Sequence, residues 1–293
     1  MKKTAVLLTL ILAISLLAGC APAAPAAQVS ATTPPVYCFA SALLEGTDIS
    51  VKPLINEPVS CLHDYTLNID QVKTAEASQV IVISGAGLED FMGDLLDPEK
   101  CIDASAGIQL LEAKPHQHEE EHQEDHGHDR DPHIWLSPVN AQTMAENIAA
   151  GLITHYPHQE KTIEGNLQSL TAQLQDLQTY GEETLSQLST RELITFHDGF
   201  AYLAQAFDLT ILRSIEEEHG SEASAKDLSD LIALVEEHQL PAVFTEANGS
   251  DAAASVIARE TGAETYELTT AMGDTDYFGS MKKNIDTLKE ALQ

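Results

Sequence analysis

The sequence predicts an α/β protein in which two lobes, each built on a parallel sheet, are joined by one long helix. Short apolar runs alternate with longer stretches of helical periodicity in both halves of the chain. The runs are continuously apolar, which is typical of parallel strands that helices cover on both faces. Between the two halves, apolar residues recur at helical spacing over a long stretch that contains no proline. We therefore expect two lobes and a connecting helix.

The N-terminus has the pattern of a bacterial export signal. Lys2 and Lys3 precede an apolar run, Ala5–Leu17, which is too short to cross a bilayer because a spanning helix needs roughly 20 residues. The run ends in Leu17-Ala-Gly-Cys20, which looks like a lipobox and implies that residues 1–19 are removed and Cys20 is diacylated. The alternative is an ordinary signal peptide that happens to contain a cysteine. Since no other stretch is apolar enough to span, the acyl chains would be the only membrane anchor.

Residues 20–35 are predicted to form a flexible tether, because alanine, proline and threonine dominate them and no periodicity is present. The first lobe then covers residues 36–157. Four apolar runs in it are predicted as strands, at Val36–Ala40, Val51–Ile55, Val80–Ser84 and Cys101–Ala104. Two helices are predicted between them, at Leu67–Ala77 and Gly87–Leu96.

The connecting helix is predicted over residues 158–189. From His158 to Leu188 there is no proline, and Pro157 lies just before the start. Such a helix would be about 45 Å long and would cross the molecule; the alternative is a pair of shorter helices inside one domain. The second lobe, residues 190–293, repeats the alternation of the first. Its strands are predicted at Leu193–Phe196, Thr210–Ile215, Ala242–Thr245 and Thr265–Leu268, and its helices at Gly199–Phe207, Ser224–His238, Asp251–Gly262 and Asp276–Leu292.

Charge and cysteine content exclude several classes of function. The formal net charge is −31, which argues against binding to nucleic acid or to anionic membrane surfaces, since both attract cations. Besides Cys20 the chain has Cys38, Cys61 and Cys101 but no Cys-x-x-Cys pair, so thiolate metal sites and thioredoxin-like chemistry are not expected. One disulfide among these three would fit an extracytoplasmic protein, and buried free thiols are the alternative. The sequence does not choose a pair.

One segment, residues 116–129, is dense in histidine and acidic residues, and we call it the His-rich loop. Its 14 residues hold five histidines, six acids and no apolar side chain. Because it has nothing to bury that would offset the entropy of ordering, we expect it to be disordered. Imidazoles at this density chelate divalent metals, zinc above all. The loop is therefore predicted to be an accessory metal collector through His116, His118, His122, His126 and His128.

Three histidines outside this loop have contexts that are typical of ligands in a rigid site. His63 follows the second predicted strand, and His197 ends the first strand of the second lobe. Open α/β sheets place their ligands at the carboxyl ends of strands, so both positions favour binding. His133 lies in Asp131-Pro-His-Ile-Trp-Leu136, directly after the His-rich loop. Each alone would more often be a structural histidine, but the three together predict a metal site.

The order of these motifs resembles the zinc and manganese solute-binding proteins of ABC importers, the ZnuA/TroA-like group. The resemblance rests on the lipobox, LHDYTL, GAGLEDF, the His-rich loop, DPHIWLSPVNA and FHDGFAYLAQAFDL, and it covers Val36 to Leu292. It implies two Rossmann-like lobes bridged by a rigid helix, with the ion held between them. By motif, His63 and His133 would come from the first lobe and His197 from the second, each through a neutral imidazole nitrogen.

The fourth metal ligand is left open, because the sequence departs from the family in two places. Many members carry a carboxylate in the loop after the last strand, where this chain has Leu268-Thr-Thr-Ala-Met272, and others have a glutamate where Leu62 stands. The candidates are Glu246, the acidic run that ends at Glu218, and water. Three imidazoles suit tetrahedral zinc, whereas manganese prefers oxygen ligands, so Zn2+ is the predicted cargo.

The resemblance implies a monomeric extracytoplasmic protein, anchored through Cys20, that captures Zn2+ and passes it to the permease of an ABC importer. Manganese or iron import by the same class of protein is the first alternative. A surface adhesin or zinc-storage lipoprotein that uses the His-rich loop alone is the second. A hydrolytic zinc enzyme is the third, since three histidines and a water also describe such sites. Because the chain has no His-Glu-x-x-His motif and no obvious general base beside a proposed ligand, we expect a binding protein and not an enzyme.

Overall fold

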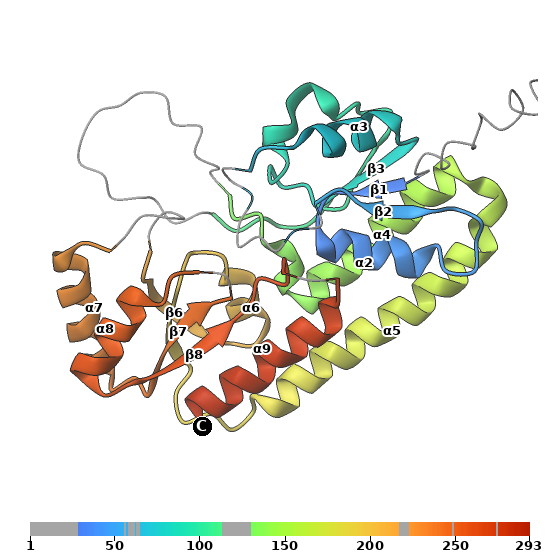
Figure 1. Ribbon diagram of the computed structural model, residues 1–293. Coiled ribbons are helices and arrows are strands. Elements are labelled where there is room, and N and C mark those ends of the chain that lie inside the picture. The colour runs from blue at the N-terminus through green and yellow to red at the C-terminus, as the bar shows by residue number, and fades with distance from the viewer. Residues whose placement is uncertain are drawn as a thin grey trace, which may run out of the picture.

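The computed structural model describes residues 29–55, 57, 62, 65–112, 130–216, 223–247, 249–273 and 275–293. It has the predicted architecture, with two parallel-sheet lobes and a long helix that runs beside both of them (Figure 1). Within these ranges no helix is both long enough and apolar enough to cross a membrane. Some of the predicted features lie outside the described residues: the signal peptide, Cys20, Cys61, His63, Glu218 and the His-rich loop.

The sheet of the first lobe contains four short strands. In spatial order they are β2 (Val51–Pro53), β1 (Val29–Ala31), β3 (Val80–Ile83) and β4 (Cys101–Asp103). All four are parallel, and Ala31 of β1 pairs with Pro53 on one side and with Val82 on the other. The strand order changes direction at β1, and open α/β sheets bind their ligands beside such a point.

Different helices cover the two faces of this sheet. Val82 of β3 faces the large central core, and its neighbour Ile81 faces a smaller core that includes Met92. Helix α3 (Ile69–Ala77) and the 3-10 helix η1 (Asp90–Leu95) cover the smaller core. The sheet is therefore buried on both faces, as its continuously apolar strands predict.

The folded part of the chain begins earlier than predicted, and two predictions in this region are wrong. The residues predicted as a strand at Val36–Ala40 belong to helix α2 (Pro34–Leu43), and the predicted tether contains β1 and the start of that helix. Prolines occupy the first turn of α2, where a missing N–H removes no helical hydrogen bond. A short apolar run fits a strand or a buried helix equally well, which explains the first error. The second arises because β1 is the run Val29-Ser-Ala31, which is not continuously apolar and lies among alanines, prolines and threonines.

Two long helices pack against each other and contribute to the large core. Helix α4 (Pro138–His155) was not predicted; it starts at Ser137, whose hydroxyl oxygen accepts from the backbone N–H of Asn140. The 3-10 turn η3 (Pro157–Gln159) then leads into the connecting helix α5 (Glu160–Thr184), whose 25 residues span about 38 Å. Helix α5 is shorter at both ends than predicted, because a 3-10 turn precedes it and its last turn closes at residue 185.

The second lobe follows the prediction closely. Its elements are β5 (Glu192–Thr195), α6 (Ala201–Ala206), β6 (Thr210–Ser214), α7 (Ala225–His238), β7 (Ala242–Glu246), α8 (Ala252–Thr261), β8 (Glu264–Leu268) and α9 (Tyr277–Leu292). Parallel pairs join β5 to β6 and β7 to β8 as two two-stranded sheets, and β5 lies beside β7, so the strands follow one another in space as β6, β5, β7 and β8. Helices α7 and α8 pack on one face, and α9 packs on the other face next to α5 (Figure 1).

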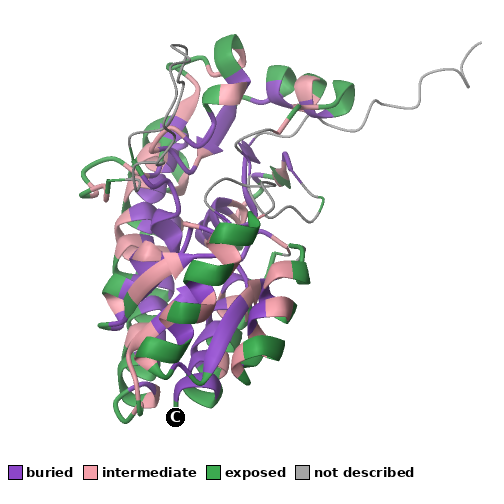
Figure 2. Ribbon diagram, turned by 90° about the vertical axis from the view of Figure 1, so that its left-hand side faces the viewer, coloured by how far each residue is buried: buried purple, intermediate pink, exposed green. Residues whose placement is uncertain are grey.

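One continuous apolar core joins the two lobes. It includes Val82 of the first sheet, Leu170 and Leu174 of α5, and Phe244 of β7, and Figure 2 shows buried residues running through the centre of the molecule. Gly181 of α5 contributes to this packing, because a Cβ there would lie 2.2 Å from a ring carbon of Phe207. A wide separation of the lobes would expose part of this core to water, which is unfavourable.

Glu89 is a buried carboxylate at the carboxyl end of the first sheet. Its Oε1 accepts from the Thr32 hydroxyl at 2.6 Å and from the Ser84 backbone N–H at 2.7 Å, and its Oε2 accepts from the Gly85 backbone N–H at 2.9 Å. Desolvation by burial raises the pKa of Glu89 from 4.5 to about 7, in spite of the opposing effect of these three donors. Glu89 therefore exchanges a proton near neutral pH when the chain is folded.

The Glu89→Gln variant should lose part of the pH dependence of stability. Below about pH 4.5 the carboxyl is protonated in the folded and unfolded chains alike, and between that pH and about 7 only the folded chain keeps the proton. The contribution of Glu89 to the free energy of unfolding should therefore fall by about 3 kcal/mol as the pH rises through this window. Urea unfolding between about pH 5 and 8 measures it, with the exposed Glu260→Gln as the control. Parallel pH curves for the unchanged protein and Glu89→Gln would contradict the prediction.

Candidate metal-binding site

His133 is held in the interior by the residue two positions before it. The Oδ1 of Asp131 accepts from the backbone N–H of His133 at 2.9 Å and lies 2.8 Å from its Nδ1. Both side chains are only 4% exposed. When Nδ1 donates to a carboxylate, the lone pair lies on Nε2, and this is the arrangement that orients histidine ligands in metal sites.

His197 repeats this arrangement from the second lobe. It follows β5, and its Nδ1 contacts Oε2 of Glu246, the last residue of β7; both side chains are buried. The hydroxyl of Thr195 donates to the backbone carbonyl of His197 at 3.1 Å, which fixes the chain as it leaves the strand. Because β5 and β7 are neighbours, their carboxyl ends bring the imidazole and the carboxylate together.

The imidazoles of His133 and His197 lie side by side. Their ring centroids are 5.4 Å apart. Both rings also lie close to the Cα of Gly199. A Cβ on this residue would lie 2.3 Å from Nε2 of His197 and 3.1 Å from Cε1 of His133. The absence of a side chain on Gly199 therefore leaves room for the two rings.

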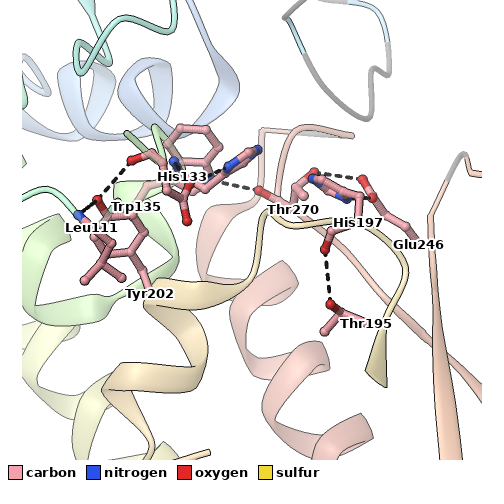
Figure 3. A network of polar contacts seen from close by, with 9 residues as sticks. Leu111, His133, Trp135, Thr195, His197, Tyr202, Glu246 and Thr270 are labelled. Atoms are coloured by element: carbon pink, nitrogen blue, oxygen red, sulfur yellow. Dashed lines mark hydrogen bonds and ion pairs between the residues drawn. The ribbon is translucent and has the colours of Figure 1, made fainter. Parts of the chain in front are cut away.

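The segment around His133 is attached to the second lobe on both sides (Figure 3). Before the histidine, the Tyr202 hydroxyl donates to the backbone carbonyl of Asp131 at 2.9 Å. After it, the indole Nε1 of Trp135 donates to the backbone carbonyl of Thr270 at 2.7 Å. Burial raises the pKa of Tyr202 to about 12, so its hydroxyl keeps its proton at neutral pH. These bonds fix His133 relative to His197, although the two come from different lobes.

The structure brings together His133, His197 and Glu246 of the residues predicted for the site, whereas His63 and Glu218 lie outside the described ranges. Glu246, a candidate for the fourth ligand, contacts the Nδ1 of His197, while Nε2 of that ring lies beside Gly199. In the described part of the chain, no three side chains of His, Cys, Asp or Glu are grouped in a way that could hold a metal ion. That this pair of imidazoles binds a metal ion stays a prediction.

Sequence reasoning missed two residues that support these histidines. Asp131 had a local signal, because an aspartate two residues before a histidine can reach both its backbone N–H and its ring. Thr270 had none, since it meets Trp135 through its backbone carbonyl across a large separation in the chain. The donors present, two buried imidazoles with Nδ1 directed at carboxylates, are those that zinc sites use.

Comparison with known proteins gives one family match. The family model described as "ZnuA: Zinc-uptake complex component A periplasmic" matches residues 29–291. The zinc-binding lipoprotein AdcA of Streptococcus pneumoniae is 30% identical over an alignment 314 positions long, which covers 99% of this chain and 61% of that protein. The high-affinity zinc uptake system protein ZnuA of Bacillus subtilis is 35% identical over 201 residues, or 65% of this chain and 63% of that protein. The chain thus spans about three fifths of the length of these curated relatives.

Solved structures agree with the family match. A crystal structure of ZnuA superposes with a TM-score of 0.79 at 29% identity, and the match covers 90% of this chain and 98% of the other. A zinc-bound ZnuA deletion mutant gives a TM-score of 0.77 at 28% identity, covering 90% and 97% of the two chains. These matches confirm the predicted fold of two parallel-sheet lobes with a long connecting helix.

Proposed function

The chain belongs to the ZnuA family, the periplasmic component A of zinc-uptake complexes, and from this premise we propose that it captures Zn2+ outside the cytoplasmic membrane and delivers it to the permease of an ABC importer. The observation that carries the proposal is the buried pair His133 and His197, supplied by two lobes and each oriented by a carboxylate. Relatives named as a zinc-binding lipoprotein and as a high-affinity zinc uptake protein support it. The family is one of binding proteins, in agreement with the expectation that the chain is not an enzyme.

In this proposal the zinc ligands are Nε2 of His133, Nε2 of His197 and an imidazole nitrogen of His63. Asp131 and Glu246 act on the outer side of the first two rings, where they hold Nδ1 and make Nε2 a better donor. The contact of Glu246 with His197 favours this supporting role over direct coordination. Water or Glu218 then completes the tetrahedral set that zinc prefers.

The proposed ligand set favours zinc over manganese. Imidazole nitrogens suit zinc, whereas manganese prefers oxygen ligands and binds more weakly to nitrogen sites. The three residues directly after β8 are Thr269, Thr270 and Ala271, and none of these side chains offers a carboxylate oxygen to a metal. We therefore propose zinc, and not manganese or iron, as the transported ion.

The remaining parts of the proposal rest on the sequence. Diacylation of Cys20 would tether a monomeric binding protein to the outer face of the membrane, within reach of its permease. The His-rich loop would collect zinc weakly through its five imidazoles and pass it to the site next to its C-terminal end at His133.

Deleting residues 116–129 should lower the number of zinc ions bound and leave one tight site, because the tight site uses histidines outside the loop. Calorimetric titration of the purified protein with and without the loop measures both quantities. A competition titration with Mn2+ on the loop-deleted protein then tests the choice of metal. Loss of the tight site together with the loop, or manganese binding as tight as zinc binding, would overturn the proposed function.

A further inference from the structure

The loop after β8, residues 269–271, is held in an unfavourable backbone conformation. Ala271 is buried and has φ +60°, a left-handed value that residues with a Cβ rarely adopt. The side chain of Asn284 in α9 holds the loop through two hydrogen bonds to Thr269. Its Oδ1 accepts from the Thr269 N–H at 2.9 Å, and its Nδ2 donates to the Thr269 carbonyl at 2.7 Å. The backbone N–H of Ala271 also donates to the Thr269 hydroxyl at 3.1 Å. Backbone strain that is held in place in this way is concentrated at functional sites.

Thr270, in the strained loop, contacts both the segment of His133 and the carboxylate beside His197. The Thr270 carbonyl accepts from Nε1 of Trp135 at 2.7 Å, and the carbonyl of Trp135 in turn accepts from the Tyr277 hydroxyl at 2.7 Å. The Thr270 hydroxyl donates to Oε1 of Glu246 at 3.4 Å, while Oε2 of the same carboxylate contacts His197. One buried residue thus connects the segment of the first histidine to the carboxylate that orients the second (Figure 3).

We propose that Thr270 is a positioning residue of the zinc site, which fixes the two imidazoles relative to each other through Trp135 and Glu246. The inference rests on the proposed zinc-binding function and goes beyond it, because it gives a role to a residue outside the proposed ligand set. Trp135 lies two residues after His133 and is completely buried, so a bond to its indole N–H limits movement of that histidine. The hydroxyl on Glu246 limits rotation of the carboxylate and therefore of the His197 ring. In this chain the loop holds the partners of the proposed ligands, at the position where many members of the family carry a carboxylate ligand.

The Thr270→Val variant tests the proposal, because valine has nearly the same shape but no hydroxyl. We expect the zinc Kd to rise about tenfold, as for the loss of other outer partners of metal ligands. With Co2+ in place of zinc, the visible absorption bands should shift, because the ring of His197 is less well fixed. Thr270→Ser restores the hydroxyl and should restore both the Kd and the spectrum. Thr154→Val is the control, since the Thr154 hydroxyl donates to the Ala150 carbonyl on the exposed surface of α4.

Ala271→Gly provides a second test that does not endanger the fold. Glycine adopts a positive φ without strain, so thermal unfolding of the metal-free variant should occur at or above the temperature of the unchanged protein. Zinc should nevertheless dissociate several times faster, because the loop is less rigid. A merely structural role would make stability and zinc binding change together. This inference alone would be overturned if the unchanged protein binds zinc tightly and both Thr270→Val and Ala271→Gly keep its zinc affinity and its cobalt spectrum. If the unchanged protein does not bind zinc, the proposed function is overturned as well.

Discussion

The His197→Ala variant should bind zinc at least about a hundredfold more weakly than the unchanged protein, because even the loss of an outer partner of a ligand costs about 10- to 100-fold. The variant removes a proposed zinc ligand, and it also leaves the buried carboxylate of Glu246 without its imidazole neighbour. His133→Ala should have an effect of the same size, since its surroundings are equivalent. Competition between the protein and a coloured chelator of known affinity measures the loss.

A histidine away from the site serves as the control for both variants. His158 is exposed in η3, so His158→Ala should leave the zinc Kd unchanged. Thermal unfolding of the metal-free proteins shows whether a variant is folded before zinc is added. If folded His197→Ala and His133→Ala both keep the tight site, the ion does not lie between these rings.

Local sequence patterns predicted the fold well where a helix is long enough to show a period, as on the buried face of α5. The four strands of the second lobe were predicted from short runs that alternate with helical stretches. The errors concern the region of β1 and α2, the boundaries of elements, and helix α4. A strand of only three residues is stable at β1 because it pairs with β2 on one side and with β3 on the other. The sequence does not show which strands pair. Helix α4 was missed because its first residues were interpreted only as part of a ligand motif.

Only those residues of the site could be predicted whose side chains are typical metal ligands. His197 stands out because it follows the end of a strand, and His133 because of the motif in which it lies; the structure places their rings next to each other. The residues that hold these histidines in place could not be identified from side-chain type. Thr270 meets Trp135 through its backbone carbonyl, which every residue has, and its hydroxyl meets Glu246 from another strand. Glu246 was noticed for its carboxylate, but its contact with Nδ1 of His197 depends on which strands are neighbours.

The Gly199→Ala variant should lose tight zinc binding to a similar extent as removal of a histidine, by about a hundredfold. The added Cβ would lie 2.3 Å from Nε2 of His197, a distance that real Cβ atoms essentially never show, so the ring must move. His197 is buried against Glu246 and Phe200 and has little space into which it can move. The same Cβ would crowd Cε1 of His133 at 3.1 Å, so both proposed ligands are displaced by one methyl group. Zinc titration of the variant against the chelator measures the effect.

The cause of this loss can be separated from any general effect of replacing glycine. Gly199 is not among the residues with positive φ, so alanine introduces no backbone strain there, and the clash with the rings is the source of the effect. Gly165 in α5 is the matched control: a Cβ there meets nothing within 4 Å, and alanine favours the helix by about 1 kcal/mol over glycine. Gly165→Ala should therefore unfold at a slightly higher temperature and bind zinc as the unchanged protein does. Tight zinc binding by a folded Gly199→Ala protein would show that the ion is held away from the facing edges of the two imidazoles, and His133 and His197 would then be structural histidines.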